Sequence, residues 1–149
     1  AGYQNLTIGV ADGSSTFNGV ITNTDDNPAF VGNLVKVGTG TIALTGANTY
    51  TGTTTVQAGT LSLGNGTISS NLADSAAVIV ANGGRLHLNY SGTDTVNALG
   101  FGGIARPPGV YSSATSSFIT GFPDIGLTPS TICFLSCSCV LPHTGPRKN

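Results

Sequence analysis

Apolar and polar residues alternate in short stretches along most of this chain, and one such stretch occurs three times. The recurring phrase is Gly-x-(Leu/Ile)-x-Leu, at residues 40–44, 59–63 and 84–88. The first two copies are 19 residues apart, and the third follows 25 residues later. Alternation places the apolar side chains on one face of a strand. A strand that recurs at about the length of one coil predicts a chain that stacks on itself, a β-solenoid.

The spacing also predicts which side chains form the core. We expect Leu61 to lie one coil above Ile42, and Leu63 one coil above Leu44. Val37 and Val56 are likewise 19 residues apart, so we expect a second strand of each coil to repeat with the first. The side chains predicted to point inward are Ile42, Leu44, Val56, Leu61, Leu63, Val78 or Val80, Leu86 and Leu88.

Composition supports an all-β protein and narrows the possible partners. Charged residues make up only 7% of the chain, Glu is absent, and Gly occurs 22 times. With a net charge of −1 and no basic patch in the body of the chain, nucleic acid is not an expected partner. No stretch is long and apolar enough to predict a membrane span, and no signal peptide is evident. Because Ala1 is not a start methionine, we expect the chain to be processed from a longer precursor.

Two regions are predicted: a β-solenoid over residues 1–121 and an irregular C-terminal tail over residues 122–149. The tail contains a linker bounded by Pro123 and Pro129, followed by an apolar strand from Thr131 to Leu141. Such a strand can fold back over its own last coil or add to a neighbouring molecule. We expect the neighbour, because a self-cap would end assembly and leave the edge of the first coil open.

Several motifs resemble the autotransporter-associated β-strand repeat family of bacterial secreted and surface proteins. They are STFNGVI at residues 15–21, KVGTGT at 36–41, LTGANTYTG at 44–52 and VQAGTL at 56–61. Residues 90–111, with GTDTV and PGVY, resemble segments that commonly follow the repeat in large secreted members. The resemblance implies a right-handed parallel β-helix that is exported and non-catalytic in its repeat region. Members are usually far longer than this chain, and the tail after Phe122 does not match the family.

The sequence offers little for catalysis, cofactors or metals. Its aspartates are scattered, apart from Asp25 and Asp26, which we interpret as a solvated turn and not a calcium loop. His87 alternates with Leu86 and Leu88, so we expect it to face solvent. Acid–base catalysis requires paired titratable groups, and none are evident. We therefore expect no enzyme activity, no cofactor and no metal site.

The three cysteines, Cys133, Cys137 and Cys139, all lie in the apolar tail strand. Because their number is odd, at least one thiol must stay free or form a disulfide with another chain. Cys137 and Cys139 point the same way if the segment is a strand, an arrangement that suits a metal or an intermolecular bond. The alternative, which we weigh equally, is that they are small buried apolar residues.

The resulting hypothesis is an extracellular or cell-surface structural protein that stacks end to end with copies of itself into a filament or surface layer. An alternative is an adhesin or passenger fragment that displays loops, residues 22–33 and 64–74, to cell-surface or glycan ligands. A polysaccharide-processing β-helix enzyme is a weaker alternative. The residues expected at the contact between subunits are Leu6, Ile8, Val10, Ile132, Phe134, Leu135, Val140 and Leu141.

Overall fold

The protein is all-β over the residues that its computed structural model describes. The described residues are 2–23, 30–67, 72–73, 75–90, 93–107, 109–113, 116–121 and 131–134, and they contain no helix. The strands are β1 (Gly2–Ile8), β2 (Ser15–Phe17), β3 (Phe30–Lys36), β4 (Thr41–Leu44), β5 (Thr54–Leu63), β6 (Ala77–Leu88), β7 (Thr93–Val96), β8 (Ala98–Phe101), β9 (Ile104–Ala105), β10 (Val110–Tyr111), β11 (Ile119–Gly121) and β12 (Thr131–Phe134).

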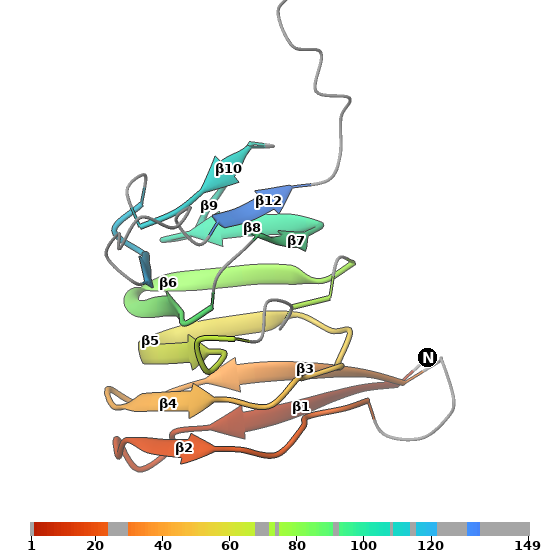
Figure 1. The fold of residues 1–149 in the computed structure, drawn as a ribbon, viewed down its shortest axis with the longest axis vertical. Coiled ribbons are helices and arrows are strands. Elements are labelled where there is room, and N and C mark those ends of the chain that lie inside the picture. Colours follow the sequence, from red (N-terminus) through yellow and green to blue (C-terminus); the bar gives the residue numbers. More distant parts are fainter. Residues whose placement is uncertain are drawn as a thin grey trace, which may run out of the picture.

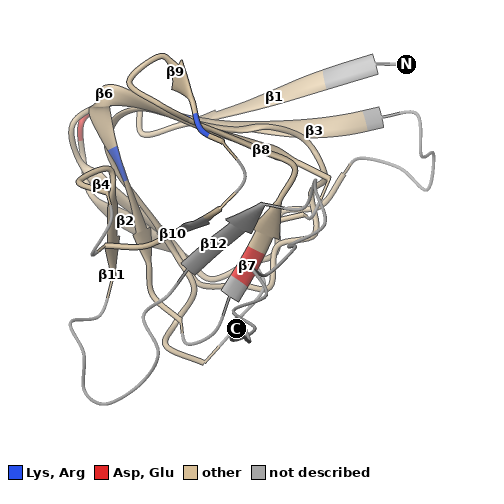
Figure 2. Cartoon of the chain, turned by 90° about the horizontal axis from the view of Figure 1, so that it is seen from above, with Lys and Arg blue, Asp and Glu red and all other residues tan. Residues whose placement is uncertain are grey.

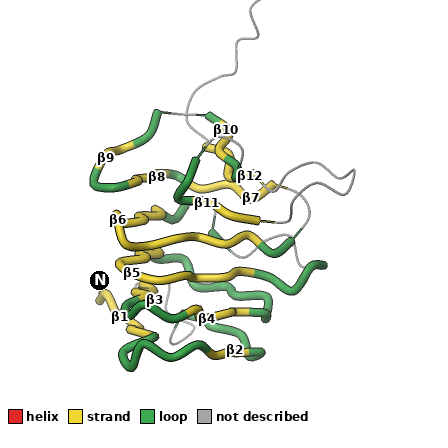
Figure 3. Tube along the Cα trace, turned by 90° about the vertical axis from the view of Figure 1, so that its left-hand side faces the viewer, coloured by secondary structure: helices red, strands yellow, loops and turns green. Residues whose placement is uncertain are grey.

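Strands from successive passes of the chain lie above one another and pair mostly in parallel (Figure 1). We call each pass a layer. The first layer contains β1 and β2, the second contains β3 and β4, and β5 and β6 each supply both strands of a layer. One column of strands therefore runs β1, β3, β5, β6, β8, and a second runs β2, β4, β5, β6, β11. Figure 3 shows the same layers, with strand segments stacked above one another and joined by loops.

The core consists of apolar side chains that repeat at the same position in each layer. Ile42 pairs with Leu61, and Leu61 pairs in turn with Leu86. Leu44 is aligned with Leu63 in the same way. These register pairs confirm the vertical alignment predicted from the 19-residue spacing. All the side chains predicted to point inward are buried: Ile42, Leu44, Val56, Leu61, Leu63, both Val78 and Val80, Leu86 and Leu88.

The predicted alignment of Val37 with Val56 is wrong. Val56 pairs with Lys36, and Val37 is half-buried at the corner that follows β3. The reason is the length of the corner. The path from Lys36 to Ile42 is one residue longer than the path from Val56 to Leu61, although Ile42 and Leu61 are aligned. The column that contains Ile42 and Leu61 therefore repeats after fewer residues than the column that contains Lys36 and Val56. As a result, the charged Lys36 occupies the core position aligned with Val56.

The recurring phrase begins with glycine because successive layers lie in close contact at this position. Gly59 has a φ of +62°, a conformation that residues with a Cβ adopt only with strain. A Cβ at this position would lie 2.5 Å from the carbonyl oxygens of both Gly38 and Gly40 in the layer below. The corner between the two strand columns can therefore stack this tightly only if glycine occupies it.

Candidate functional site

The N-terminal end of the stack leaves apolar side chains uncovered. β1 pairs with β3 and with no other described strand, so its outer edge is open. Of the predicted contact residues on this end, Leu6 is 45% exposed and Val10 is 76% exposed, while Ile8 packs partly against the core. Phe17 and Val20 on the same layer are about half exposed. The structure thus places these residues at an end face, and their role between subunits stays a prediction.

The C-terminal end differs, because strands of the same chain cover it. β12 pairs in parallel with β7 and antiparallel with β10, so that Ile132 lies opposite Asp94 on one side and Tyr111 on the other. Over Thr131–Phe134 the tail strand pairs within its own chain, and a contact between subunits through the longer segment 131–141 stays a prediction. The strand contains Ile132 and Phe134. Leu135, Val140 and Leu141 lie outside the described residues.

Of the cysteines, Cys133 alone falls within the described part of the chain. Its backbone is paired with that of Thr95 in β7 and that of Val110 in β10. Cys137 and Cys139 lie outside the described residues, so a disulfide or metal involving them stays a prediction. The described residues contain no group of three or more His, Cys, Asp or Glu side chains that could hold a metal ion.

The most unusual buried side chain is Lys36, whose environment the sequence did not reveal. It is completely buried in the column that continues through Val56. Its Nζ donates hydrogen bonds to the carbonyl oxygens of Val37 and Gly38, both at 2.7 Å, and of Ala58 at 3.1 Å. Burial lowers the pKa of the Lys36 ammonium, while the nearby charge of Asp12 acts in the opposite direction. The bonds link the corners of two successive layers.

A second buried polar group organises the loop beneath β7. Asp94 is 2% exposed, and its carboxylate accepts hydrogen bonds from the backbone amide of Leu72 at 3.0 Å and from the hydroxyl of Tyr90 at 3.4 Å. Burial, and then the charge of Asp94, raise the pKa of Tyr90. Burial likewise raises the pKa of Tyr50 to about 12, although its hydroxyl shares a 2.7 Å hydrogen bond with Thr54. The hydrogen bond from Leu72 fixes the backbone of its loop, and Asp94 is enclosed by its partners.

Two further titratable groups, Asp12 and His87, each have a hydrogen-bond partner of their own. Asp12 accepts a hydrogen bond from the amide of Thr39 at a layer corner. His87 faces away from the buried Leu86 and Leu88 as expected, but it is half-buried because β11 lies beside it. Its Nδ1 is 3.1 Å from the hydroxyl oxygen of Thr120, and burial lowers its pKa. Asp25 and Asp26 lie outside the described residues. Charged side chains in the described part of the chain are sparse (Figure 2).

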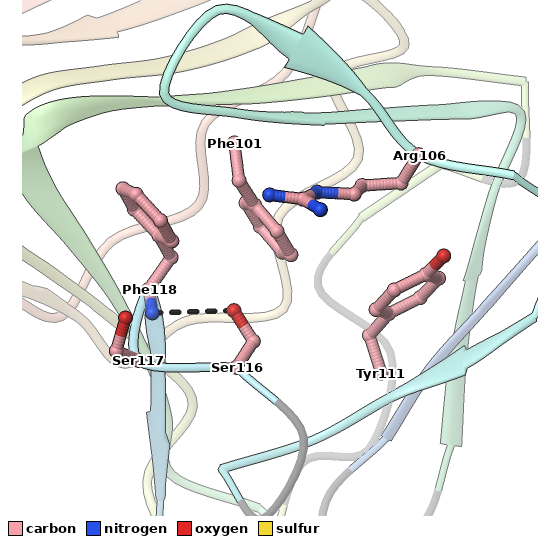
Figure 4. Close-up of a pocket in the computed structure, with 6 residues that line it drawn as sticks. All are labelled: Phe101, Arg106, Tyr111, Ser116, Ser117 and Phe118. Carbon is pink, nitrogen blue, oxygen red and sulfur yellow. Dashed lines mark hydrogen bonds between the residues drawn. The ribbon is translucent and has the colours of Figure 1, made fainter.

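A hollow of about 190 Å³ lies at the C-terminal end of the stack (Figure 4). Phe101, the last residue of β8, and Phe118, just before β11, form parallel stacked rings with centroids 5.2 Å apart. The ring of Tyr111 meets Phe101 edge to face at 6.0 Å. The residues lining the hollow are Phe101, Arg106, Tyr111, Ser116, Ser117 and Phe118.

Arg106 gives this hollow its charge. Its guanidinium carbon lies 5.3 Å from the centre of the Phe101 ring, within the range of a cation–π contact. Its backbone amide donates to the carbonyl of Leu99, which fixes the start of the side chain. The Nε atom is buried and has no hydrogen-bond partner. No sequence pattern relates the members of this group, because they come from separate short strands and loops.

Comparison with known protein families identifies one segment of the chain. Residues 34–63 match the model of the passenger-associated-transport-repeat. The match confirms the resemblance to the autotransporter-associated repeat, and it extends from Leu34 within β3 through β4 to the end of β5. No curated protein and no solved structure matches the chain. Among the described residues there is no helix with the length and apolar character that crossing a membrane requires.

Proposed function

We propose that this chain is a structural, non-catalytic section of a secreted or surface-exposed passenger protein, folded as a right-handed parallel β-solenoid. Its role is to form a rigid stack from which loops are displayed. The repeat family is associated with the passengers of autotransporters, which carry their passenger to the outside of the cell. The handedness follows from that resemblance.

The observation that carries this proposal is that the matched repeat spans two successive layers that stack in register. The match begins at Leu34 in β3 and ends at Leu63, the last residue of β5. It therefore contains the paired residues of one layer, in β3 and β4, and the whole of β5, which stacks on them in register. In a solenoid each repeat contacts only its neighbours, so a sequence repeat that spans two stacked layers fits such a fold.

The placement of the acidic groups favours a structural role over hydrolysis or elimination. Glycoside hydrolysis uses two carboxyl groups that flank one bond. Here Asp94 is enclosed by Leu72 and Tyr90, while Asp12 serves a corner of another layer. Both are used to satisfy backbone amides.

The proposal can be tested by replacing the passenger of a heterologous autotransporter with the full chain. We expect the chain to reach the cell surface and to resist added protease there. Leu61→Asp, in the buried column, should reach the surface as a protease-sensitive chain, because an unpaired charge in the core prevents stacking. Val10→Asp is the matched control at an exposed position and should remain resistant. Retention of the wild-type chain inside the cell, or equal resistance of Leu61→Asp, would contradict the proposal.

A filament of stacked copies is a second candidate, and the exposed apolar side chains of the first layer favour it. An open strand edge beside Leu6 and Phe17 is a surface on which another strand can add. Electron micrographs of the negatively stained full chain test this directly. Uniform fibres that disappear in a Leu6→Lys variant support the filament. Dispersed particles at every concentration leave the passenger section as the function.

A further inference from the structure

The hollow at the C-terminal end combines a cation, aromatic rings and hydroxyl groups in a way that the stacking of layers does not require. Elsewhere the described interior is filled mainly by aliphatic columns, the buried Tyr50 and Tyr90 have hydroxyl partners, and the buried cation Lys36 has three carbonyl partners. Arg106 instead has a buried Nε without a partner, beside a hollow large enough for one small ring. That Nε is enclosed by protein, so the groups of Arg106 that can meet a ligand in the hollow are its two Nη atoms.

We propose that this hollow binds a sugar carboxylate, a hexuronate residue of an acidic polysaccharide, with Arg106 holding the carboxylate. The proposal rests on the surface-exposed role proposed above, and it names the ligand of that surface. In this arrangement one N–H of each Nη of Arg106 donates to one of the two carboxylate oxygens.

The guanidinium selects a carboxylate because of its shape. Its N–H donors lie in one plane and match the two oxygens of a carboxylate, which gives two parallel charge-assisted hydrogen bonds. Phe101 lies against the guanidinium and restricts its orientation, so less side-chain freedom is lost on binding (Figure 4). Phe118 supports Phe101 from its other side through the stacked contact.

The rest of the lining favours a sugar over an amino acid or a peptide. Ser117 is exposed at the hollow, and the Oγ of Ser116 accepts from the amide of Phe118, which leaves its own hydroxyl hydrogen to donate. Hydroxyl groups and aromatic edges suit a hydroxylated ring. None of the described lining residues carries a carboxylate, so none of them would pair with the ammonium of an amino acid.

The test is a titration of the full chain with sodium glucuronate and sodium galacturonate, followed by backbone amide NMR shifts. Glucose and galactose, which lack the carboxylate, are the ligand controls, and acetyl-alanyl-alanine supplies a peptide carboxylate without an ammonium. Arg106→Gln and Arg106→Lys are the protein variants. Arg85→Gln is the matched control, because Arg85 is an exposed arginine on β6 whose loss changes net charge equally.

We expect saturable shifts at Phe101, Ser117 and Phe118 with the uronates and none with the neutral sugars. Arg106→Gln should weaken uronate binding about tenfold or more, since it removes both charge-assisted bonds. Arg106→Lys keeps the charge but not the fork, so it should also weaken binding, and Arg85→Gln should not. Equal binding by Arg106→Gln and the wild type, or tighter binding of the peptide carboxylate than of the uronates, overturns the proposal. Protease resistance at the cell surface is independent of these outcomes, so failure here does not affect the proposed passenger role.

Discussion

The ammonium of Lys36 donates a hydrogen bond to the carbonyl oxygen of Ala58, one layer above it, at a distance of 3.1 Å. The same ammonium donates to the carbonyls of Val37 and Gly38 in its own corner. A single buried side chain thus fixes the relative position of two layer corners. Its four-carbon stem occupies a core position aligned with Val56, so the residue contributes packing as well as hydrogen bonds.

Lys36→Met tests this role, because methionine retains most of the stem and removes the donors. The variant leaves three carbonyl oxygens without their donor, and we expect a loss of roughly 2–4 kcal/mol in the free energy of unfolding. Urea unfolding followed by circular dichroism measures it. Arg85→Met, at an exposed position, is the control and should change the free energy by less than about 0.5 kcal/mol. Equal stability of both variants would show that the buried bonds contribute nothing.

The contact at Gly59 predicts that the recurring phrase cannot begin with alanine there. Gly59→Ala introduces both a strained backbone and a collision with the carbonyls of Gly38 and Gly40. We therefore expect the free energy of unfolding, measured in urea, to fall by roughly 3 kcal/mol or more. Gly66→Ala separates the two effects. Gly66 also has a positive φ, of +91°, but a Cβ there meets nothing within 4 Å. The free energy of unfolding of the Gly66→Ala variant should fall by only about 1 kcal/mol. Similar losses in the two variants would mean that layer contact is not what requires the glycine.

The sequence revealed the core columns because their signal is local. Alternation within Thr41–Leu44, and again around Leu61, shows which side chains share a face, and the spacing between the two stretches gives the number of residues in a layer. The burial of Lys36 could not be predicted from alternation, since a lysine next to a turn is expected to be exposed. Its burial depends on the corner being one residue longer than the next, and on carbonyls that only the stacked structure brings together.

The hollow was beyond sequence reasoning for a different reason. Phe101, Arg106, Tyr111 and Phe118 belong to strands of a few residues separated by irregular loops, where no period relates one to the next. The partial burial of His87 could not be predicted for a similar reason. Alternation correctly turned it away from Leu86, but it could not show that Thr120 of β11 would lie against it.

Alkaline pH should destabilise the protein through its buried tyrosines. The pKa of Tyr50 is raised to about 12 in the folded state against 10.0 for the unconstrained side chain, and burial raises that of Tyr90 as well. The folded protein therefore retains protons that the unfolded chain loses. The stability from this source is fully present below pH 10 and is lost as the pH rises from about 10 towards 12.

Urea unfolding at a series of pH values, with tyrosinate absorbance recorded in parallel, measures this effect. Tyr50→Phe should reduce the alkaline loss of stability, because one of the late-titrating hydroxyls is gone. The variant should also lose some stability at neutral pH, where the hydrogen bond to Thr54 is removed. Complete tyrosine ionisation near pH 10 in protein that is still folded would contradict the burial of both hydroxyls.

The last prediction concerns the tail strand, which lies between β7 and β10 of its own chain. Truncation after Gly121 removes β12 and leaves β7 without its described strand partner. We expect a lower urea midpoint and more self-association, because an uncovered strand edge is a template for pairing with another chain. Truncation after Phe134 is the matched control, since it keeps β12, and it should retain the midpoint of the full chain. Sedimentation velocity measures the association. A tail that served only to join subunits would give the reverse: truncation after Gly121 would reduce association and leave the stability of the monomer unchanged.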